Sequence, residues 1–412
     1  MGRAKGGIGE TSTDGFLNLL GTRRGSNRQD TDHLHHETHA TADGKTIDTW
    51  RLWKDGPLHH PSAPALITTD AEGKPAVIEY YFDGELHRTD GPAVITEDTF
   101  EDITTRKQEW YMNGKRHRLD GPAITKLTSV GSLQETYYVN GEKHRLDGPA
   151  FIDERANGSR REEYYFHDEL HRDNEPAVIV TNADREEPVY IEYKQHGVLH
   201  RFDGPAFIEH DTDAGEILVE EYYQDGLLHR EDGPALVRVA PDSDDVVVRR
   251  EEYYDVGVLH RLDGPAITMT EPDGYLRQEE YWVDGKRHRE DGPALWQRSK
   301  DGKTSHEEYL IHGVPHRLGG PATLTITPAK GQKNKRFHVY KEEWQKDGRL
   351  HRVDGPAVTA KRGDGNIREE YLVEGEYHRE GAPALTITDS EGNLLAEQWW
   401  DNGTQLDGPP AS

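Results

Sequence analysis

A single motif recurs along most of this chain, and it limits the folds that the sequence can adopt. The motif reads Glu-aromatic-aromatic-x-Asp/Asn-Gly-x-x-His-Arg-x-Asp-Gly-Pro-Ala, followed by two or three apolar residues that alternate with Thr. Its histidines are 27 to 35 residues apart, and they are His59, His87, His117, His144, His171, His200, His229, His260, His288, His316, His351 and His378. A thirteenth copy, residues 397–410, lacks the His-Arg pair. Such self-similarity indicates a repeat architecture in which each unit contacts its neighbours.

Each motif contains the signals of a β-hairpin. Asp or Asn directly before Gly, as at Asp83-Gly84, favours a two-residue type I′ turn, because Gly supplies the positive φ. The aromatic residues before the turn favour a strand, and we expect His-Arg to begin the return strand. Asp-Gly-Pro-Ala predicts a second turn because Pro cannot donate to a ladder. A third short strand follows, such as residues 93–96. The motif therefore predicts two or three short strands per repeat and no helix.

The composition favours a thin architecture over a deep core. Apolar residues make up 33% of the chain, charged residues 31%, and the mean hydropathy is −0.93. This leaves too little apolar area for a thick core, but 19 Tyr, 8 Trp and 8 Phe argue against disorder. We therefore expect an all-β, elongated array of about 13 hairpin repeats, each ~29 residues long, at residues 45–412. The last repeat is truncated, and residues 1–44 form an extended basic arm. The pattern leaves a closed barrel open as an alternative.

Charge and composition also exclude several partners. A formal charge of −27 disfavours nucleic acid as a partner of the array, because phosphates would be repelled. The chain has no Cys, so it can form neither a disulfide nor a thiolate metal site. No apolar run reaches the ~20 residues of a membrane span, and the N-terminus has no signal-peptide core. We expect cytoplasmic synthesis without secretion or membrane contact. A homo-oligomer and a glycan partner stay open.

The hairpin pattern resembles that of MORN-type repeat proteins. It is more similar to the MORN-variant group that includes the YwqK-like proteins of bacteria and phages. The shared features are the aromatic strand, the Asn/Asp-Gly turn and the short return strand, and they cover about nine tenths of the chain. The His-Arg-x-Asp-Gly-Pro-Ala segment departs from the usual MORN glycine pattern and resembles uncharacterised phage and bacterial repeat proteins. The resemblance implies a MORN-like ribbon or solenoid.

The His-Arg-x-Asp segment invites a catalytic or metal-binding reading, but its repetition favours structure. An enzyme needs one site rather than twelve, so we predict no catalytic residue and no cofactor. Equivalent histidines lie roughly 10 Å or more apart, too far to share a zinc ion bound at about 2 Å. The Arg is expected to pair with an acidic residue or stack on the aromatic pair, and the Asp to cap its turn. Representatives of this structural set are His87, Arg88, Asp90, His117, Arg118, Asp120, His229, Arg230, Asp232, His288, Arg289 and Asp291.

The N-terminal arm differs in kind from the repeats. Residues 1–28 carry five basic and two acidic side chains, on a chain that is otherwise acidic. An apolar patch within this arm could dock on a partner protein and become ordered there. The predicted docking residues are Phe16, Leu17, Leu19, Leu20, Arg23 and Arg24. A disordered tail is the alternative.

These features predict a non-enzymatic structural or adhesive protein of a larger assembly. A phage virion component (tail, fibre, baseplate or capsid decoration), anchored by its arm, fits them best, and the phage link rests on the resemblance. One alternative is a cytoplasmic interaction module of antitoxin or immunity type. A carbohydrate-binding or glycosidase rod is a second alternative, but a glycosidase needs a single carboxylate pair about 5 to 9.5 Å apart. The carboxylate clusters in this sequence are repeated or lie in loops.

Overall fold

The computed structural model describes residues 33–185, 187–211, 215–242, 245–328 and 338–409. These residues form β-strands, turns and loops, and the described ranges contain no helix, as the motif predicts. The chain divides into two compact units, Met1–Lys143 and His144–Ser412. Each unit is built from the same repeat, so one repeat explains the local structure of both.

The repeat around His229 illustrates the design. Strand β24 (Ile217–Glu221) leads into a small hairpin of β25 (Tyr223–Gln224) and β26 (Leu227–Leu228). The loop after His229 then brings β27 (Leu236–Pro241) back, antiparallel and directly beside β24. The small hairpin therefore lies in the connection between two strands that pair with each other. Strand β27 next pairs with the first strand of the following repeat, which joins successive repeats into one ladder.

In the first unit, the ladder strands pair antiparallel in chain order. They are β1 (His35–Ala40), β2 (Thr46–Arg51), β3 (Leu66–Thr69), β4 (Pro75–Glu79), β7 (Val94–Phe100), β8 (Ile103–Glu109), β11 (Ile124–Thr128) and β12 (Leu133–Thr136). Its small hairpins are β5 (Tyr81–Phe82) with β6 (Glu85–Leu86), β9 (Tyr111–Met112) with β10 (Lys115–Arg116), and β13 (Tyr138–Val139) with β14 (Glu142–Lys143). Because β1 already pairs with β2, the ladder starts before residue 45.

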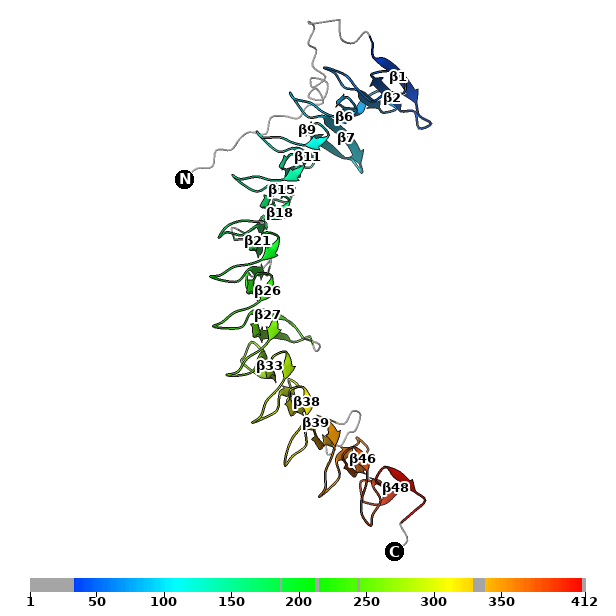
Figure 1. The fold of residues 1–412 in the computed structure, drawn as a ribbon, viewed down its shortest axis with the longest axis vertical. Helices are drawn as coiled ribbons and strands as arrows, with labels where there is room; N and C mark the ends of the chain where they lie inside the picture. Colours follow the sequence, from blue (N-terminus) through cyan, green and yellow to red (C-terminus); the bar gives the residue numbers. More distant parts are fainter. Residues whose placement is uncertain (1–32, 186, 212–214, 243–244, 329–337, 410–412) are drawn as a thin grey trace. The chain divides into compact units, whose positions relative to one another are not determined.

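The second unit continues the same order through many more repeats (Figure 1). Besides β24 and β27, its ladder strands are β15 (Phe151–Glu154), β16 (Arg160–Glu163), β19 (Val178–Thr181), β20 (Tyr190–Glu192), β23 (Phe207–His210), β28 (Val247–Glu252), β31 (Ile267–Thr270), β32 (Leu276–Glu280), β35 (Leu295–Arg298), β36 (Ser305–Glu308), β39 (Thr323–Pro328), β40 (His338–Glu343), β43 (Val358–Lys361), β44 (Ile367–Glu370), β47 (Leu385–Thr388) and β48 (Leu394–Asp401).

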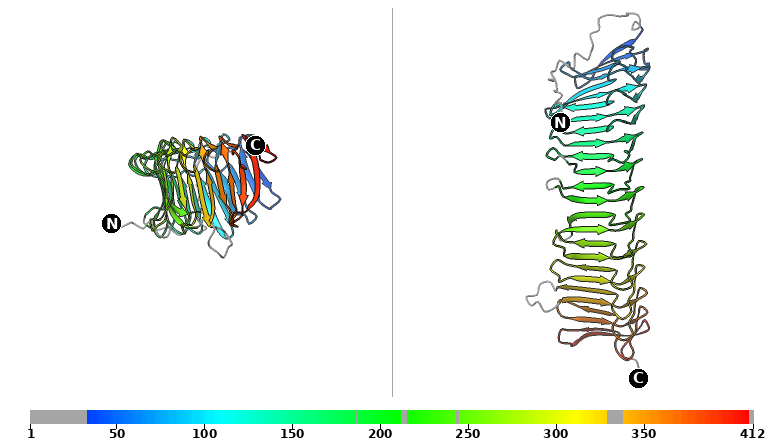
Figure 2. Two further views of the ribbon diagram at one scale, coloured as in Figure 1. Left: turned by 90° about the horizontal axis from the view of Figure 1, so that it is seen from below. Right: turned by 90° about the vertical axis from the view of Figure 1, so that its left-hand side faces the viewer.

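The small hairpins of the second unit follow one another along the ladder (Figure 2). Besides β25–β26, they are β17 (Tyr165–Phe166) with β18 (Glu169–Leu170), β21 (Lys194–Gln195) with β22 (Val198–Leu199), β29 (Tyr254–Asp255) with β30 (Val258–Leu259), β33 (Trp282–Val283) with β34 (Lys286–Arg287), β37 (Leu310–Ile311) with β38 (Val314–Pro315), β41 (Gln345–Lys346) with β42 (Arg349–Leu350), and β45 (Leu372–Val373) with β46 (Glu376–Tyr377). The last strand, β49 (Thr404–Leu406), pairs with the end of β48.

Both ladders are open. Within each unit the described ladder strands pair with their neighbours in the chain, and the first strand does not pair with the last. A closed barrel, which the sequence left open, is therefore not formed. The fold is an all-β array of hairpins, as the motif predicts. One detail differs from the prediction: the return strand β26 ends at Leu228, so His229 and Arg230 lie just beyond it, in the loop.

The backbone angles identify the tight turns. Asp83 and Gly84 have φ of 50° and 87°, so both central residues are left-handed, as a type I′ turn requires. The repeat without a turn Gly keeps this geometry, with Asp168 at φ 66°. A β-branched residue, Val256, occupies the first position of another turn at φ 43°. A bulky residue is costly there, because its Cβ crowds the following carbonyl.

Replacing Val256 by Asn is therefore expected to stabilise the array by about 1 kcal/mol, because Asn tolerates left-handed φ and Val does not. In the turn of the preceding repeat, Gly226 occupies the second position at φ 80°. Gly226→Ala places a Cβ at this left-handed residue and is expected to destabilise the array by a similar amount. Urea unfolding followed by circular dichroism measures both. Equal midpoints for wild type and Val256→Asn would show that this turn stores no strain.

The core is a narrow column. The Ala of Pro-Ala is completely buried in each of the twelve repeats that carry the His position, at Ala65, Ala93, Ala123, Ala150, Ala177, Ala206, Ala235, Ala266, Ala294, Ala322, Ala357 and Ala384. Around it lie one or two aliphatic residues and an aromatic ring, as in the cluster of Ile78, Tyr80, Ala93 and Ile95. The backbone of this Ala is bonded to the strands on both sides, as Ala93 is to Glu109 and Tyr80.

Candidate functional site

The repeated histidine joins each repeat to the next. Its Nδ1 atom accepts a hydrogen bond from a backbone N–H in the hairpin turn of the following repeat. The bonds are 3.0 to 3.4 Å long and link His59 to Asp83, His87 to Asn113, His117 to Asn140, His144 to His167, His171 to His196, His200 to Asp225, His229 to Val256, His260 to Asp284, His288 to His312, His316 to Asp347, His351 to Glu374, and His378 to Asn402.

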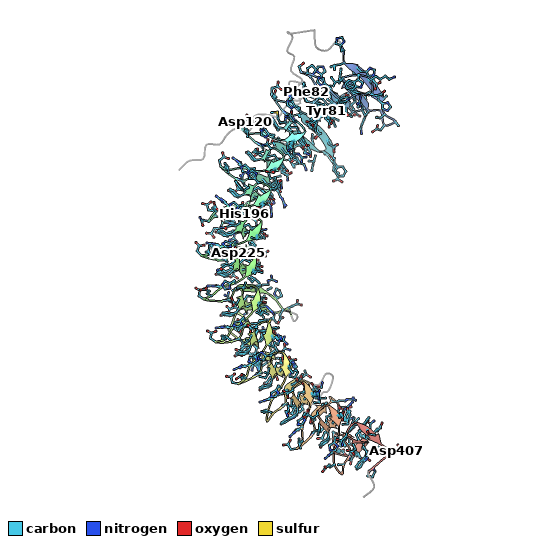
Figure 3. The ribbon with its side chains drawn as sticks, in the orientation of Figure 1. Tyr81, Phe82, Asp120, His196, Asp225 and Asp407 are labelled. Atoms are coloured by element: carbon cyan, nitrogen blue, oxygen red, sulfur yellow. The ribbon has the colours of Figure 1, made fainter. Side chains whose placement is uncertain are left out.

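This bond belongs to a set that fixes the register of neighbouring hairpins. Beside the His87 bond, Gly114 donates its backbone N–H to the carbonyl of Leu86, at 2.9 Å. Arg88 donates its own N–H to the carbonyl of Tyr111, at 3.1 Å. An Nδ1 atom that accepts must be unprotonated, so the proton of the neutral ring is on Nε2. Figure 3 shows two of the turn residues that donate these bonds, His196 and Asp225, at successive hairpins.

At seven of the twelve steps a carboxylate also lies beside the same Nδ1 atom. The distances are 3.0 to 3.2 Å, and the pairs are His59–Asp83, His200–Asp225, His229–Asp255, His260–Asp284, His316–Asp347, His351–Glu374 and His378–Asp401. These carboxylates belong to the hairpin of the next repeat. They supply an acceptor for a proton on Nδ1.

The repeated arginine lies flat on the first aromatic ring of its own repeat. The guanidinium carbon is 3.6 to 4.1 Å from the ring centre, within the range of a cation–π contact. The pairs are Arg88–Tyr80, Arg118–Trp110, Arg172–Tyr164, Arg201–Tyr193, Arg230–Tyr222, Arg261–Tyr253, Arg289–Tyr281, Arg317–Tyr309, Arg352–Trp344 and Arg379–Tyr371.

The repeated aspartate pairs with this arginine. Arg230 donates from Nε to Asp232 Oδ1 at 3.0 Å and from Nη1 to the carbonyl of Pro234 at 3.4 Å. The same Nε bond joins Arg88 to Asp90, Arg118 to Asp120, Arg145 to Asp147, Arg201 to Asp203, Arg261 to Asp263, Arg289 to Asp291 and Arg352 to Asp354. The arginine hydrogen bond lowers the pKa of Asp232 below the ordinary range. The arginine thus binds two groups of its own loop, the aspartate and the proline carbonyl, and holds the loop in shape.

Repeats without this aspartate keep the arginine in place. Arg317, in a repeat with Gly319, still donates to the carbonyl of Pro321, at 3.1 Å. In the repeat with Asn174, Arg172 pairs instead with the carboxylate of Glu175. The aromatic stack and the carbonyl bond therefore hold the loop, and the aspartate adds to them.

The glycine after this aspartate is required by space. A Cβ atom at Gly233 would lie 2.9 Å from the guanidinium carbon of Arg230, closer than real contacts allow. Its φ lies outside the left-handed region. The Asp-Gly-Pro sequence therefore predicts a turn correctly, but the glycine serves the arginine stack rather than a positive φ.

A second repeated pair was not predicted from the sequence. The glutamate that ends a ladder strand accepts a hydrogen bond from the second aromatic residue of the motif, as Tyr254 does to Glu252 at 2.7 Å. Glu252 is buried, so this bond satisfies a carboxylate that has left water. Tyr81 and Tyr223 make the same contact with Glu79 and Glu221. The spacing of two residues, which places both side chains on one face of a strand, is the signal in the sequence.

These tyrosines are expected to make the stability of the fold decrease at high pH. Burial, together with the nearby glutamate, raises the pKa of Tyr81 and of Tyr223 to about 12. A folded-state pKa above the unfolded value means that the neutral phenol is favoured by folding. This contribution is complete below about pH 10 and is lost as the pH rises through 12. Ultraviolet titration should show tyrosines ionising near pH 12, together with loss of β-structure. Ionisation of all 19 Tyr near pH 10 would contradict it.

Shallow grooves separate successive loops. One groove, of about 650 Å³, is lined by the Arg88–Pro92 loop, Trp110, and the loop from His117 to Asp120. Its counterpart in the second unit has about 570 Å³ and lies between the Arg145 and Arg172 loops. The arginines of these loops pair with acidic side chains of the same loops. Within the described ranges, no group of three or more His, Asp or Glu side chains is placed to hold a metal ion.

The structure thus places all twelve representative residues of the predicted set in repeat contacts. The predicted docking residues Phe16, Leu17, Leu19, Leu20, Arg23 and Arg24 lie outside the described residues. No helix among the described residues is long and apolar enough to cross a membrane. Comparison with known proteins adds no identity: no family model matches this chain, and no curated protein matches it.

Proposed function

We propose that this protein is a non-enzymatic structural component of a larger assembly, in which the array presents a periodic series of hairpins and loops. One observation carries the proposal: the polar atoms of His-Arg-x-Asp make the same contacts in repeat after repeat. The histidine Nδ1 atom joins two repeats, and the arginine is held by a ring, a carboxylate and a carbonyl. Side chains that make the same internal contacts in each repeat favour a structural role over a catalytic one.

The carboxylates support the same proposal. A glycosidase needs one acid and one base or nucleophile, about 5 to 9.5 Å apart, in environments that separate their pKa values. Here Asp90, Asp120, Asp232 and Asp291 occupy equivalent loops, and each pairs with its own arginine. Their equivalence gives none of these four carboxylates a distinct role. A repeated scaffold is therefore a better proposal than a glycosidase rod.

The assembly that we propose is a phage particle, with the N-terminal arm as the anchor. This part rests on the resemblance to phage repeat proteins and on the basic, apolar character of residues 1–28. Burying Phe16, Leu19 and Leu20 on a partner would contribute roughly 1.5 to 3 kcal/mol each. Exposed charge pairs would add only about 0 to 1 kcal/mol apiece. Attachment should therefore depend more on the apolar side chains than on salt concentration.

Mass spectrometry of purified particles tests this proposal. The protein should be found in particles, and removal of residues 1–32 should release it while the array stays folded. This deletion keeps β1, which pairs with β2. Phe16→Asp should have most of the same effect. Incorporation of the truncated protein at the wild-type level would place the anchor in the repeats. Recovery outside particles, bound to a toxin at fixed stoichiometry, would favour an antitoxin.

A further inference from the structure

The junctions between repeats are not chemically equal. At three of them the turn residue that donates its N–H to the repeated histidine is itself a histidine. The two rings are then in contact, with centres 4.5 Å apart for His144–His167, 4.4 Å for His171–His196 and 4.3 Å for His288–His312. The ring planes are tilted by 43° and 35° in the first two pairs. The planes of the last pair are 23° apart. Two stacked imidazoles repel each other once both carry a proton.

Acidic side chains compensate one of these junctions. At the His171–His196 pair, the Nδ1 atom of His196 is 3.1 Å from the carboxylate of Glu169. The Nε2 atom of His171 is 3.4 Å from Asp173. Each ring that gains a proton therefore has a carboxylate beside it. Protonation at this junction replaces a neutral contact by ion pairs.

The His288–His312 junction has no such compensation. Among the described residues, no carboxylate oxygen lies within 4.0 Å of a ring nitrogen of either histidine. The position taken by Glu169 at the other junction is taken here by Lys286, whose Cβ lies beside Gly313 of the same turn.

The arginines and aspartates around this junction are paired. Arg287 binds Glu280 and Glu308, and Arg289 binds Asp291 and stacks on Tyr281. In the flanking repeats, the carboxylates of Asp284 and Asp347 face His260 and His316 instead. Glu290 occupies the position that Asp173 has at the other junction, but no oxygen of its carboxylate lies within 4.0 Å of a ring nitrogen of His288. Among the described residues, Lys286 has no carboxylate oxygen within 4.0 Å of its amine, so its positive charge is unpaired.

We infer that the His288–His312 junction is an acid-sensitive joint, which separates before the compensated His171–His196 junction as the pH falls. A proton from solvent adds to Nδ1 of His288, while Nε2 keeps its own. The N–H of His312 then faces another N–H, so its hydrogen bond is lost. A second proton on His312 places two cations face to face beside Lys286. The inference does not depend on the proposed assembly.

Peptide-resolved hydrogen exchange of the full-length protein tests the joint. Exchange is measured near pH 7.5 and near pH 5.5, on either side of the imidazole titration range, and corrected for the intrinsic pH dependence. Protection of the turn at residues 311–313 should fall about tenfold or more on acidification. Protection of the compensated turn at residues 195–197 should fall less than about threefold. Equal losses at both turns would overturn the inference.

Two substitutions introduce at this junction a carboxylate of the kind that lies beside histidines elsewhere in the chain. His312→Asp gives the junction the arrangement of His260 with Asp284, and Lys286→Glu gives it that of His196 with Glu169. Both variants should keep the protection at residues 311–313 within about threefold between the two pH values. If both lose protection as the wild type does, the stacked pair is not the cause. The comparison of the two wild-type turns remains decisive if a variant fails to fold.

Discussion

Replacement of Ala266 by Leu is expected to destabilise the array by about 3 kcal/mol, the upper end of typical overpacking costs. Ala266 is completely buried. Its N–H donates to the carbonyl of Glu280 at 2.7 Å, and its carbonyl accepts from the N–H of Tyr253 at 2.8 Å. The backbone is thus fixed on both sides, and a larger side chain can be placed only by breaking these bonds.

The same loop offers a matched control for this substitution. Leu262 is 80% exposed, so Leu262→Ala removes apolar atoms that contact mainly water. It should change the free energy of unfolding by no more than about 0.5 kcal/mol. Urea unfolding of both variants measures the difference. If Ala266→Leu were as stable as Leu262→Ala, the Ala266 side chain would not be enclosed as the structure places it.

Replacement of His229 by Ala is expected to cost about 1 to 3 kcal/mol, because the N–H of Val256 loses its acceptor. His229→Asn is the informative comparison, since the Asn carbonyl oxygen can take the place of Nδ1 and accept the same bond. We expect Asn to recover at least half of the lost stability. Thermal unfolding of the three proteins measures this. Equal losses for Ala and Asn would mean that the ring contributes by packing and not by accepting.

Much of the local structure follows from short-range signals. Asp83-Gly84 predicts its turn because the two residues themselves determine the backbone angles, and the structure has them at φ 50° and 87°. The regular motif predicts an all-β array, because each copy has a strand pattern and none has a helical one. The open ladder could not be predicted, because closure depends on accumulated twist rather than on any single residue.

The contacts between repeats were harder to predict. His87 and Asn113 lie 26 residues apart, and nothing in the motif says that the ring of one meets the turn of the next. The sequence placed His-Arg in the return strand, whereas both residues lie in the loop beyond it. The motif leaves the arginine two arrangements, an ion pair or an aromatic stack, and it predicts that Asp90 caps its turn, whereas Asp90 binds Arg88. Each of these depends on the path of the loop that follows the small hairpin.

In this structure the repeated motif fastens each repeat to the next. Hydrogen exchange resolved along residues 144–412, on wild type and on His229→Ala, tests it most directly. We predict that the amide of Val256 is protected in the wild type. We also predict that the variant loses protection mainly in the two hairpins that this bond joins, β25–β26 and β29–β30, since each repeat contacts its neighbours. An unprotected Val256 amide in the wild type, or a loss spread evenly over the whole unit, would contradict it.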